Sequence, residues 1–133
     1  MIRKTFLTIA ATVALAIGLI AALAPGFLLH DLKAAVPNPA ALVMAWTAGV
    51  LLIAVGIQTL PVRGHRDSPT MRAVLSGGAA LHLMLLPVDP LAYVSGAFGS
   101  VAAFLPNTAI HLLLLGGFVY FARHLRPTAP AEI

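Results

Sequence analysis

The sequence predicts an all-α integral membrane protein that folds as a four-helix bundle with an up-down-up-down course. Three observations support this prediction. Of the 133 residues, 60% are hydrophobic and only 9% are charged, whereas about a quarter of the residues of a soluble domain are charged. The apolar residues gather in four segments, each about as long as a membrane-spanning helix. These segments lack the apolar–polar alternation of membrane β-strands, so helix is the expected state.

The four predicted spans form a single transmembrane domain over residues 1–133. Each is close to the roughly 20 residues that cross about 30 Å of hydrocarbon as a helix. The spans are residues 5–24, 40–60, 71–88 and 105–122. The first segment also resembles a secretory signal peptide with "ALA" as its cleavage site, but Pro25 directly after that site disfavours cleavage. We therefore treat it as a span.

Small residues recur at three- and four-residue spacing along one face of the first two spans. They are Ala11, Ala14, Gly18 and Ala22 in the first span, and Ala45, Gly49 and Gly56 in the second. Such a face lets two helix backbones approach closely in lipid, where hydrophobicity does not drive association. The contact is expected inside the monomer, with a dimer interface as the alternative. The sequence "VPNPAA" opens the second span, because proline is tolerated in the first turn of a helix.

Basic residues predict the orientation of the spans. Seven of the eight lie before the first span, between the second and third, or after the fourth: Arg3, Lys4, Arg63, Arg66, Arg72, Arg123 and Arg126. Lys33 is the exception. This bias places both termini and the loop "PVRGHRDSPTMR" in the cytoplasm. The same basic residues could instead bind anionic lipid headgroups.

Residues 89–104 form a predicted interfacial segment at the outer face. The segment is apolar but rich in glycine and serine, and its aromatic residues Tyr93, Phe98 and Phe104 suit the headgroup level. It either extends the third span, lies flat at the interface, or dips into the membrane and returns.

Two histidines lie inside apolar runs, His82 in "LHLMLLPVDP" and His111 in "TAIHLLLLGG". Both are expected roughly 7 to 10 Å below the outer ends of their helices, at 1.5 Å per residue. Trp46 and Thr47 of the second span reach the same depth. The sequence therefore predicts a polar layer near the outer face.

Helical spacing adds three residues to this predicted layer. Gly78 and Asp89 share the side of the third span that carries His82, and Asn107 shares the side of the fourth span that carries His111. Asp89 could orient His82 only if helix persists through Pro87, which tends to break it. Asn107 is alternatively an N-cap after Pro106.

The layer admits several chemistries and identifies no catalytic residue. Haem b ligated by His82 and His111 would explain both histidines and the apolar walls. Acid–base catalysis on a lipophilic substrate, as in an intramembrane isomerase, is another use. No metal ion is expected, because two histidines and one distant acid fall short of a usual ligand set, and the chain has no cysteine. The remaining interpretation is a purely structural bond across a helix interface.

The last three spans resemble the small bacterial four-helix membrane proteins of the DoxX-like families and related domains of unknown function. The resemblance lies in "AWTAGVLLIAVGI", "MRAVLSGGAALHLMLL" and "HLLLLGGFVYFARHLR". It implies a tetraspan bundle in the bacterial inner membrane, in some cases beside redox enzymes. It carries no catalytic motif onto this chain.

Two functions follow from the sequence. The first is a non-catalytic subunit or accessory protein of a membrane assembly, favoured by the small size and the small-residue faces. The alternative is a bundle that binds a cofactor or lipophilic ligand near the outer face. The expected partners are the lipid bilayer, another membrane protein or a second copy of the chain, and a lipophilic small molecule. Nucleic acid is not expected, because the basic residues flank apolar runs. A transporter or channel is disfavoured by the absence of charge within the spans.

Overall fold

The computed structural model describes residues 2–31 and 38–126, and these residues are helical apart from short connections. The helices are α1 (Ile2–Leu23), α2 (Pro25–Asp31), α3 (Pro39–Val62), α4 (Pro69–Leu85), α5 (Val88–Val94) and α6 (Val101–Arg123). The prediction of an all-α protein is confirmed for this part of the chain.

Four of the described segments are long and apolar enough to cross a membrane. They are α1, α3, α6 and the stretch Pro69–Val94, which joins α4 and α5. In the most apolar part of each, only 11 to 28% of the residues are buried inside the molecule. Most of their apolar side chains therefore face outward, where hydrocarbon would surround them. Four such segments indicate a multi-pass membrane protein and match the four predicted spans.

Polar caps and prolines fix the beginnings of two long helices. The Asn38 side chain accepts a hydrogen bond of 2.8 Å from the amide of Ala41 at the start of α3. Ser68 Oγ accepts one of 3.1 Å from the amide of Met71 at the start of α4. A proline follows each cap at the first helical position, where its missing N–H leaves no bond unmade. Proline thus opens the second span as predicted.

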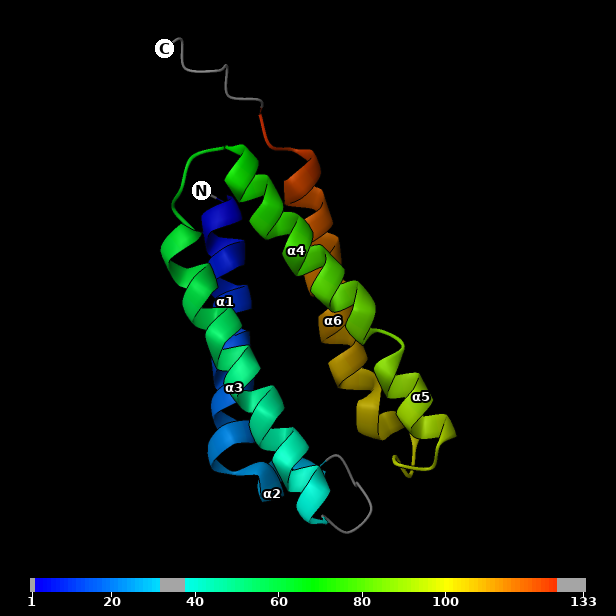
Figure 1. The fold of residues 1–133 in the computed structure, drawn as a ribbon. Coiled ribbons are helices and arrows are strands. Elements are labelled where there is room, and N and C mark those ends of the chain that lie inside the picture. The colour runs from blue at the N-terminus through cyan, green and yellow to red at the C-terminus, as the bar shows by residue number, and fades with distance from the viewer. Residues whose placement is uncertain (1, 32–37, 127–133) are drawn as a thin grey trace.

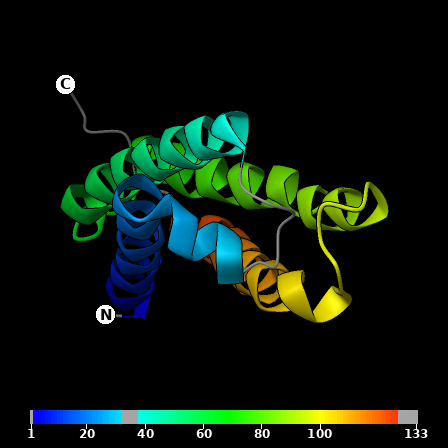
Figure 2. The same ribbon diagram turned by 90° about the horizontal axis from the view of Figure 1, so that it is seen from below.

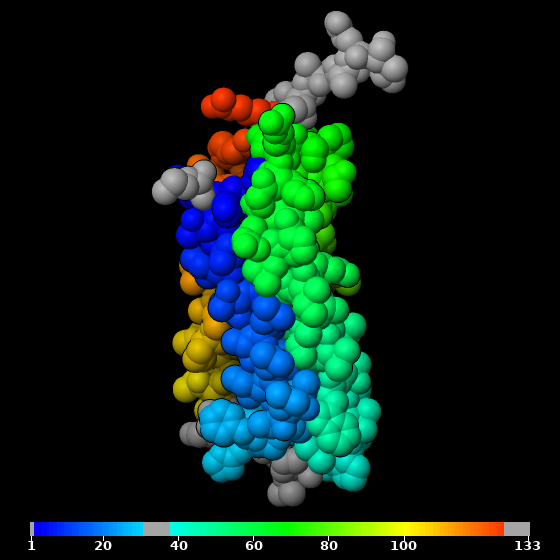
Figure 3. Space-filling model, turned by 90° about the vertical axis from the view of Figure 1, so that its left-hand side faces the viewer, coloured from blue at the N-terminus to red at the C-terminus, as the bar shows by residue number. Residues whose placement is uncertain are grey.

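Helices α1 and α3 pack side by side along most of their length (Figure 3). Glycine makes this approach possible, because a Cβ atom added at Gly49 would lie 2.6 Å from the amide nitrogen of Ala22 and 2.8 Å from the carbonyl oxygen of Gly18. At Gly56 it would lie 2.5 Å from Leu15 Cγ. The predicted small-residue faces therefore meet inside the monomer.

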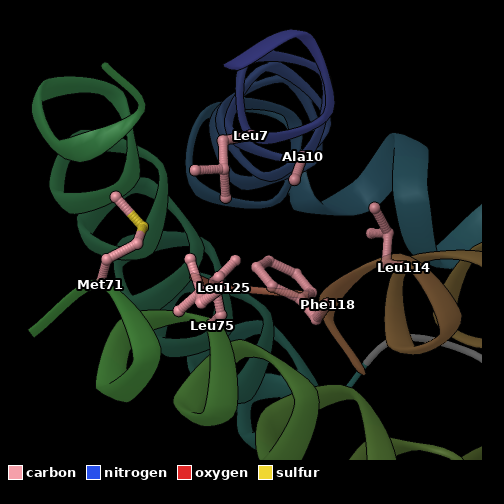
Figure 4. Packing of buried hydrophobic residues seen from close by; sticks show 7 residues of the cluster. All are labelled: Leu7, Ala10, Met71, Leu75, Leu114, Phe118 and Leu125. Atoms are coloured by element: carbon pink, nitrogen blue, oxygen red, sulfur yellow. The ribbon is translucent and has the colours of Figure 1, made fainter. Parts of the chain in front are cut away.

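A hydrophobic cluster joins α1 to the second helix pair, α4 and α6. Leu7 of α1, Leu75 of α4 and Phe118 of α6 point toward one another (Figure 4). The full cluster is Leu7, Ala10, Met71, Leu75, Leu114, Phe118 and Leu125. The rings of Phe6 and Phe118 add an edge-to-face contact with centroids 5.0 Å apart. This cluster is the buried core of the molecule.

The beginning of α1 and the end of α6 lie at the same end of the molecule. The Arg3 guanidinium binds the Asp67 carboxylate, and the backbone amide of Arg126 donates to Asp67 Oδ2 over 2.9 Å. Consecutive long helices run in opposite directions, and the α1–α3 and α4–α6 pairs diverge away from this end (Figure 1). Seen from below, α2 lies by the α1–α3 pair and α5 lies at the far end of the α4–α6 pair (Figure 2).

The predicted interfacial segment, residues 89–104, contains a short helix, a turn and the first residues of α6. Pro87 has no N–H and interrupts the third span, after which α5 continues it. This arrangement corresponds to an extension of that span. Gly96 supplies the turn with a φ of 80°, a conformation that favours glycine. Because α6 begins at Val101, Pro106 lies inside the helix and the N-cap interpretation of Asn107 is wrong.

Candidate functional site

The two histidines of the apolar runs meet between α4 and α6, and we call them the histidine pair. His82 Nδ1 and His111 Nδ1 are 2.9 Å apart, with ring centroids 5.2 Å apart and planes inclined by 43°. In such a bond one Nδ1 donates a proton and the other accepts it. Two neutral rings satisfy this requirement when they are in different tautomers. The pair is half-buried, at the contact between the two helices.

Phe118 and Gly78 shape the side of the histidine pair that faces the core. The Phe118 ring stacks on His82 with centroids 5.6 Å apart and an interplanar angle of 24°. A Cβ atom added at Gly78 would lie 2.5 Å from Phe118 Cε1. Gly78 therefore leaves the space that Phe118 fills, and the structure places this predicted residue against the ring that stacks on His82.

Asp89 is held by α6 and not by His82. The residue is only 6% exposed, and its Oδ2 accepts hydrogen bonds of 2.7 Å from Thr108 Oγ1 and 2.9 Å from Asn107 Nδ2. A contact with His82 required helix to persist through Pro87, and α4 ends at Leu85 instead. Asp89 and Asn107 thus belong to one polar group that joins α5 to α6.

Thr108 is a member of this polar group that the sequence analysis missed. Its hydroxyl makes the shorter of the two bonds to Asp89. Thr108 lies three residues before His111, which puts both on one side of α6. That spacing was the available signal, since Asn107 was selected by the same argument at four residues.

The structure does not bring Trp46 and Thr47 to the histidine pair. Both lie on α3, which packs against α1 and α2. Thr47 Oγ1 donates 2.9 Å to the carbonyl of Val43 in its own helix, and Trp46 is 47% exposed. Residue counting places a side chain at a depth but does not say which helix is its neighbour. These two residues are therefore removed from the predicted pocket.

The histidine pair does not fit a haem iron held between its facing nitrogens. Axial imidazole nitrogens stand on opposite faces of a haem, each about 2 Å from the iron and so about 4 Å apart. Here the two Nδ1 atoms bond each other directly at 2.9 Å. Among the described residues, no group of three or more His, Cys, Asp or Glu side chains could hold a metal ion.

Two cavities lie at the other end of the helices, near the joined ends of the chain. One of about 470 Å³ is lined by Arg72 and Arg126, and one of about 370 Å³ is lined by Arg3 and Asp67. The residues of the histidine pair line neither cavity. The pair is a hydrogen-bonded contact between α4 and α6.

The fold and this site can be compared with known proteins. No protein-family model, no curated protein and no solved structure matches this chain.

Proposed function

We propose that this chain is a non-catalytic subunit or accessory protein of a membrane assembly. The observation that carries the proposal is that the polar side chains between α4, α5 and α6 bind one another. His82 bonds His111, and Asp89 accepts from Asn107 and Thr108. Side chains engaged in this way hold α4, α5 and α6 together. Structural bonds of this kind need no substrate.

The outward surface of the helices supports the same proposal. Leu113 of α6 is 75% exposed, and Met84 of α4 and Val94 of α5 are similarly exposed. The described connections between the long helices are short, so little of the described chain stands outside the membrane. A partner would therefore bind the membrane-facing surface, by packing or by hydrogen bonds within the bilayer.

We place the protein in the bacterial inner membrane with both termini in the cytoplasm. The basic residues support this orientation, because Arg3, Arg63 and Arg126 all lie at the end where the α3–α4 connection joins the chain ends. The resemblance of the last three spans to DoxX-like proteins implies the inner membrane and, as in some of those proteins, a role beside a redox enzyme.

The proposal is tested by purifying the tagged full-length chain from its native membrane in mild detergent and weighing the complexes by native mass spectrometry. We expect a colourless complex that contains a second polypeptide in fixed ratio. His124→Ala serves as a control, because it removes a histidine at the end of α6, outside the histidine pair. The same complex should persist in this variant. Recovery of the chain alone, or only with copies of itself, would contradict the proposal.

A lipophilic ligand site is the second candidate, and one observation favours it. The histidine pair places two ionisable groups inside membrane-spanning segments, where such residues are commonly functional. A site of this kind would bind a lipophilic molecule at the outer end of α4 and α6. Organic extraction of the purified protein should then release a molecule that His111→Ala protein lacks and His124→Ala protein retains. Identical extracts from all three proteins would exclude this candidate.

A further inference from the structure

The larger cavity lies between the beginning of α4 and the residues that follow α6. Its volume is about 470 Å³. Its polar walls come from Ser68, Arg72, Ser76 and Arg126, and its apolar walls from Pro69, Ala73 and Leu125. We call it the arginine cavity. It lies at the end of the molecule where the basic residues gather.

Three of the polar residues of the arginine cavity follow one another along the axis of α4. Ser68, Arg72 and Ser76 are four residues apart, so they follow one face of α4. Ser76 lies about 10 Å along the helix from its first residue, at 1.5 Å per residue. The cavity thus offers cationic groups at the membrane end and a hydroxyl deeper along the same wall.

Arg126 is held in place on the opposite wall. Its backbone amide donates to Asp67 Oδ2 over 2.9 Å, and Leu125 beside it is buried in the core against Leu75 (Figure 4). These contacts fix the main chain at the amide of Arg126, and the Arg126 side chain lines the same cavity as that of Arg72. Two arginines at one cavity match the negative charge of a phosphate group, and each planar guanidinium can donate parallel hydrogen bonds to two of its oxygens.

We propose that the arginine cavity binds the phosphate of an anionic phospholipid from the leaflet on the side of the chain ends. The phosphate would lie between Arg72 and Arg126, and the glycerol region would reach toward Ser76. The acyl chains would continue over the outward apolar face of α4, where Leu83 and Met84 are exposed. Two cationic groups favour a lipid with net negative charge over a zwitterionic one.

The test is native mass spectrometry of the full-length chain in detergent with added phosphatidylglycerol, phosphatidylcholine or sodium phosphate. We expect one phosphatidylglycerol adduct at low lipid ratio, weaker phosphatidylcholine binding, and no competition by millimolar phosphate. Arg72→Gln and Arg126→Gln should each weaken the phosphatidylglycerol adduct by roughly fivefold or more. Arg72→Lys should weaken it less, because it keeps the charge and loses only the fork geometry.

Arg66→Gln and Arg123→Gln are the matched controls, since both remove a surface arginine at the same end without lining the arginine cavity. Helix content by circular dichroism should be the same in every variant. An equal loss of lipid in the controls would show that the surface attracts lipid without a site, and would overturn the proposal. Equal binding of the zwitterionic lipid, or displacement by phosphate alone, would overturn it as well.

Discussion

The imidazoles of His82 and His111 lie inside membrane-spanning segments, and each is the other's hydrogen-bond partner. Hydrogen bonds between membrane helices average about 0.6 kcal/mol in double-mutant cycles and reach about 1.7 kcal/mol. The gain is small because polar groups of an unfolded chain in the membrane also find partners. The bond therefore contributes more to the register of α4 against α6 than to the total stability.

A double-mutant cycle of His82→Ala and His111→Ala measures this bond. We expect a coupling free energy between about 0.6 and 1.7 kcal/mol for unfolding in mixed micelles. The control cycle pairs His82→Ala with Leu113→Ala, which removes an exposed side chain from the same helix as His111. Its coupling should be near zero. Additive losses in the histidine cycle would show that the two rings are not bonded in the membrane.

Thr108 donates to a carboxylate that is almost fully buried, so its removal should be costly. Thr108→Val keeps the shape of the side chain but leaves Asp89 with Asn107 as its described partner. We expect a loss of roughly 1 to 3 kcal/mol in the free energy of unfolding, the usual cost when a buried polar group loses its partner. Hydrogen exchange of the α5 amides and the unfolding free energy both report it.

Thr47→Val is the control for this substitution. The Thr47 hydroxyl bonds a carbonyl of its own helix on an exposed face, so its loss should change the unfolding free energy little. An equal effect of the two threonine substitutions would contradict the role assigned to Thr108.

Helices α1 and α3 depend on backbone contact rather than on interlocking of large side chains. At Gly49 a new methyl group would meet the backbone of Ala22 and Gly18, which cannot move without shifting α1. At Gly116 on α6 nothing lies within 4 Å of the same position. The two glycines therefore differ in surroundings while both lie inside a helix.

Gly49→Ala should destabilise the protein by about 1 to 3 kcal/mol, the usual cost of overpacking. Gly116→Ala should cost little, and the difference is measured by unfolding in detergent. Cysteines introduced on α1 and α3 for cross-linking would report whether the two helices separate. An unchanged stability of Gly49→Ala protein would mean that α1 and α3 are farther apart than described.

Residue spacing in the sequence predicted some of the contacts between helices and missed others. The faces that carry Gly18 and Gly49 were predicted because small residues repeat there at helical intervals. Small residues on one face let two helix backbones approach closely. Trp46 and Thr47 were misplaced because equal depth in a bilayer is shared by every helix of a bundle. Thr108 was missed because its hydrogen bond to Asp89 depends on the position of α5 after Pro87, which residue spacing does not predict.

The described ends of the chain and the α3–α4 connection are joined through Asp67. The Arg3 guanidinium, hydrogen-bonded to this carboxylate, holds the pKa of Asp67 below its ordinary value of 3.8, and the amide of Arg126 lowers it further. A carboxylate with a lowered pKa stabilises the folded state above its unfolded pKa. That stabilisation is lost as the pH falls through the lower, folded pKa.

Asp67→Asn should therefore reduce the melting temperature at neutral pH and make less difference as the pH falls below about 4. The quantity to measure is the gap between wild type and variant across this range, since other carboxylates titrate in both proteins. High salt should narrow the gap at neutral pH, because the pair is solvent-accessible and screened. A gap that stays constant with pH would show that the carboxylate charge does not stabilise the fold.

The orientation across the membrane can be tested at two open glycines. Nothing lies within 4 Å of the Cβ position of Gly64 in the α3–α4 connection or of Gly99 in the α5–α6 connection, and the chain has no cysteine of its own. In spheroplasts a membrane-impermeant maleimide should label Gly99→Cys directly and Gly64→Cys only after the membrane is opened. The reverse pattern would place the chain ends outside.

Hydropathy along the chain was enough to predict four spans and their helical state, although the third span extends to Val94 and α6 begins at Val101. A bilayer imposes this directly, because every backbone amide in hydrocarbon must bond within its own helix. The partner of each helix depended instead on contacts between residues far apart in sequence. Backbone contact at Gly18 and Gly49 pairs α1 with α3, and the bond from Thr108 draws Asp89 to α6 and away from His82. Residue spacing in the sequence predicts how deep a side chain lies in the membrane and which face of its helix it occupies. Which neighbouring helix that face contacts is decided only when the four helices pack together.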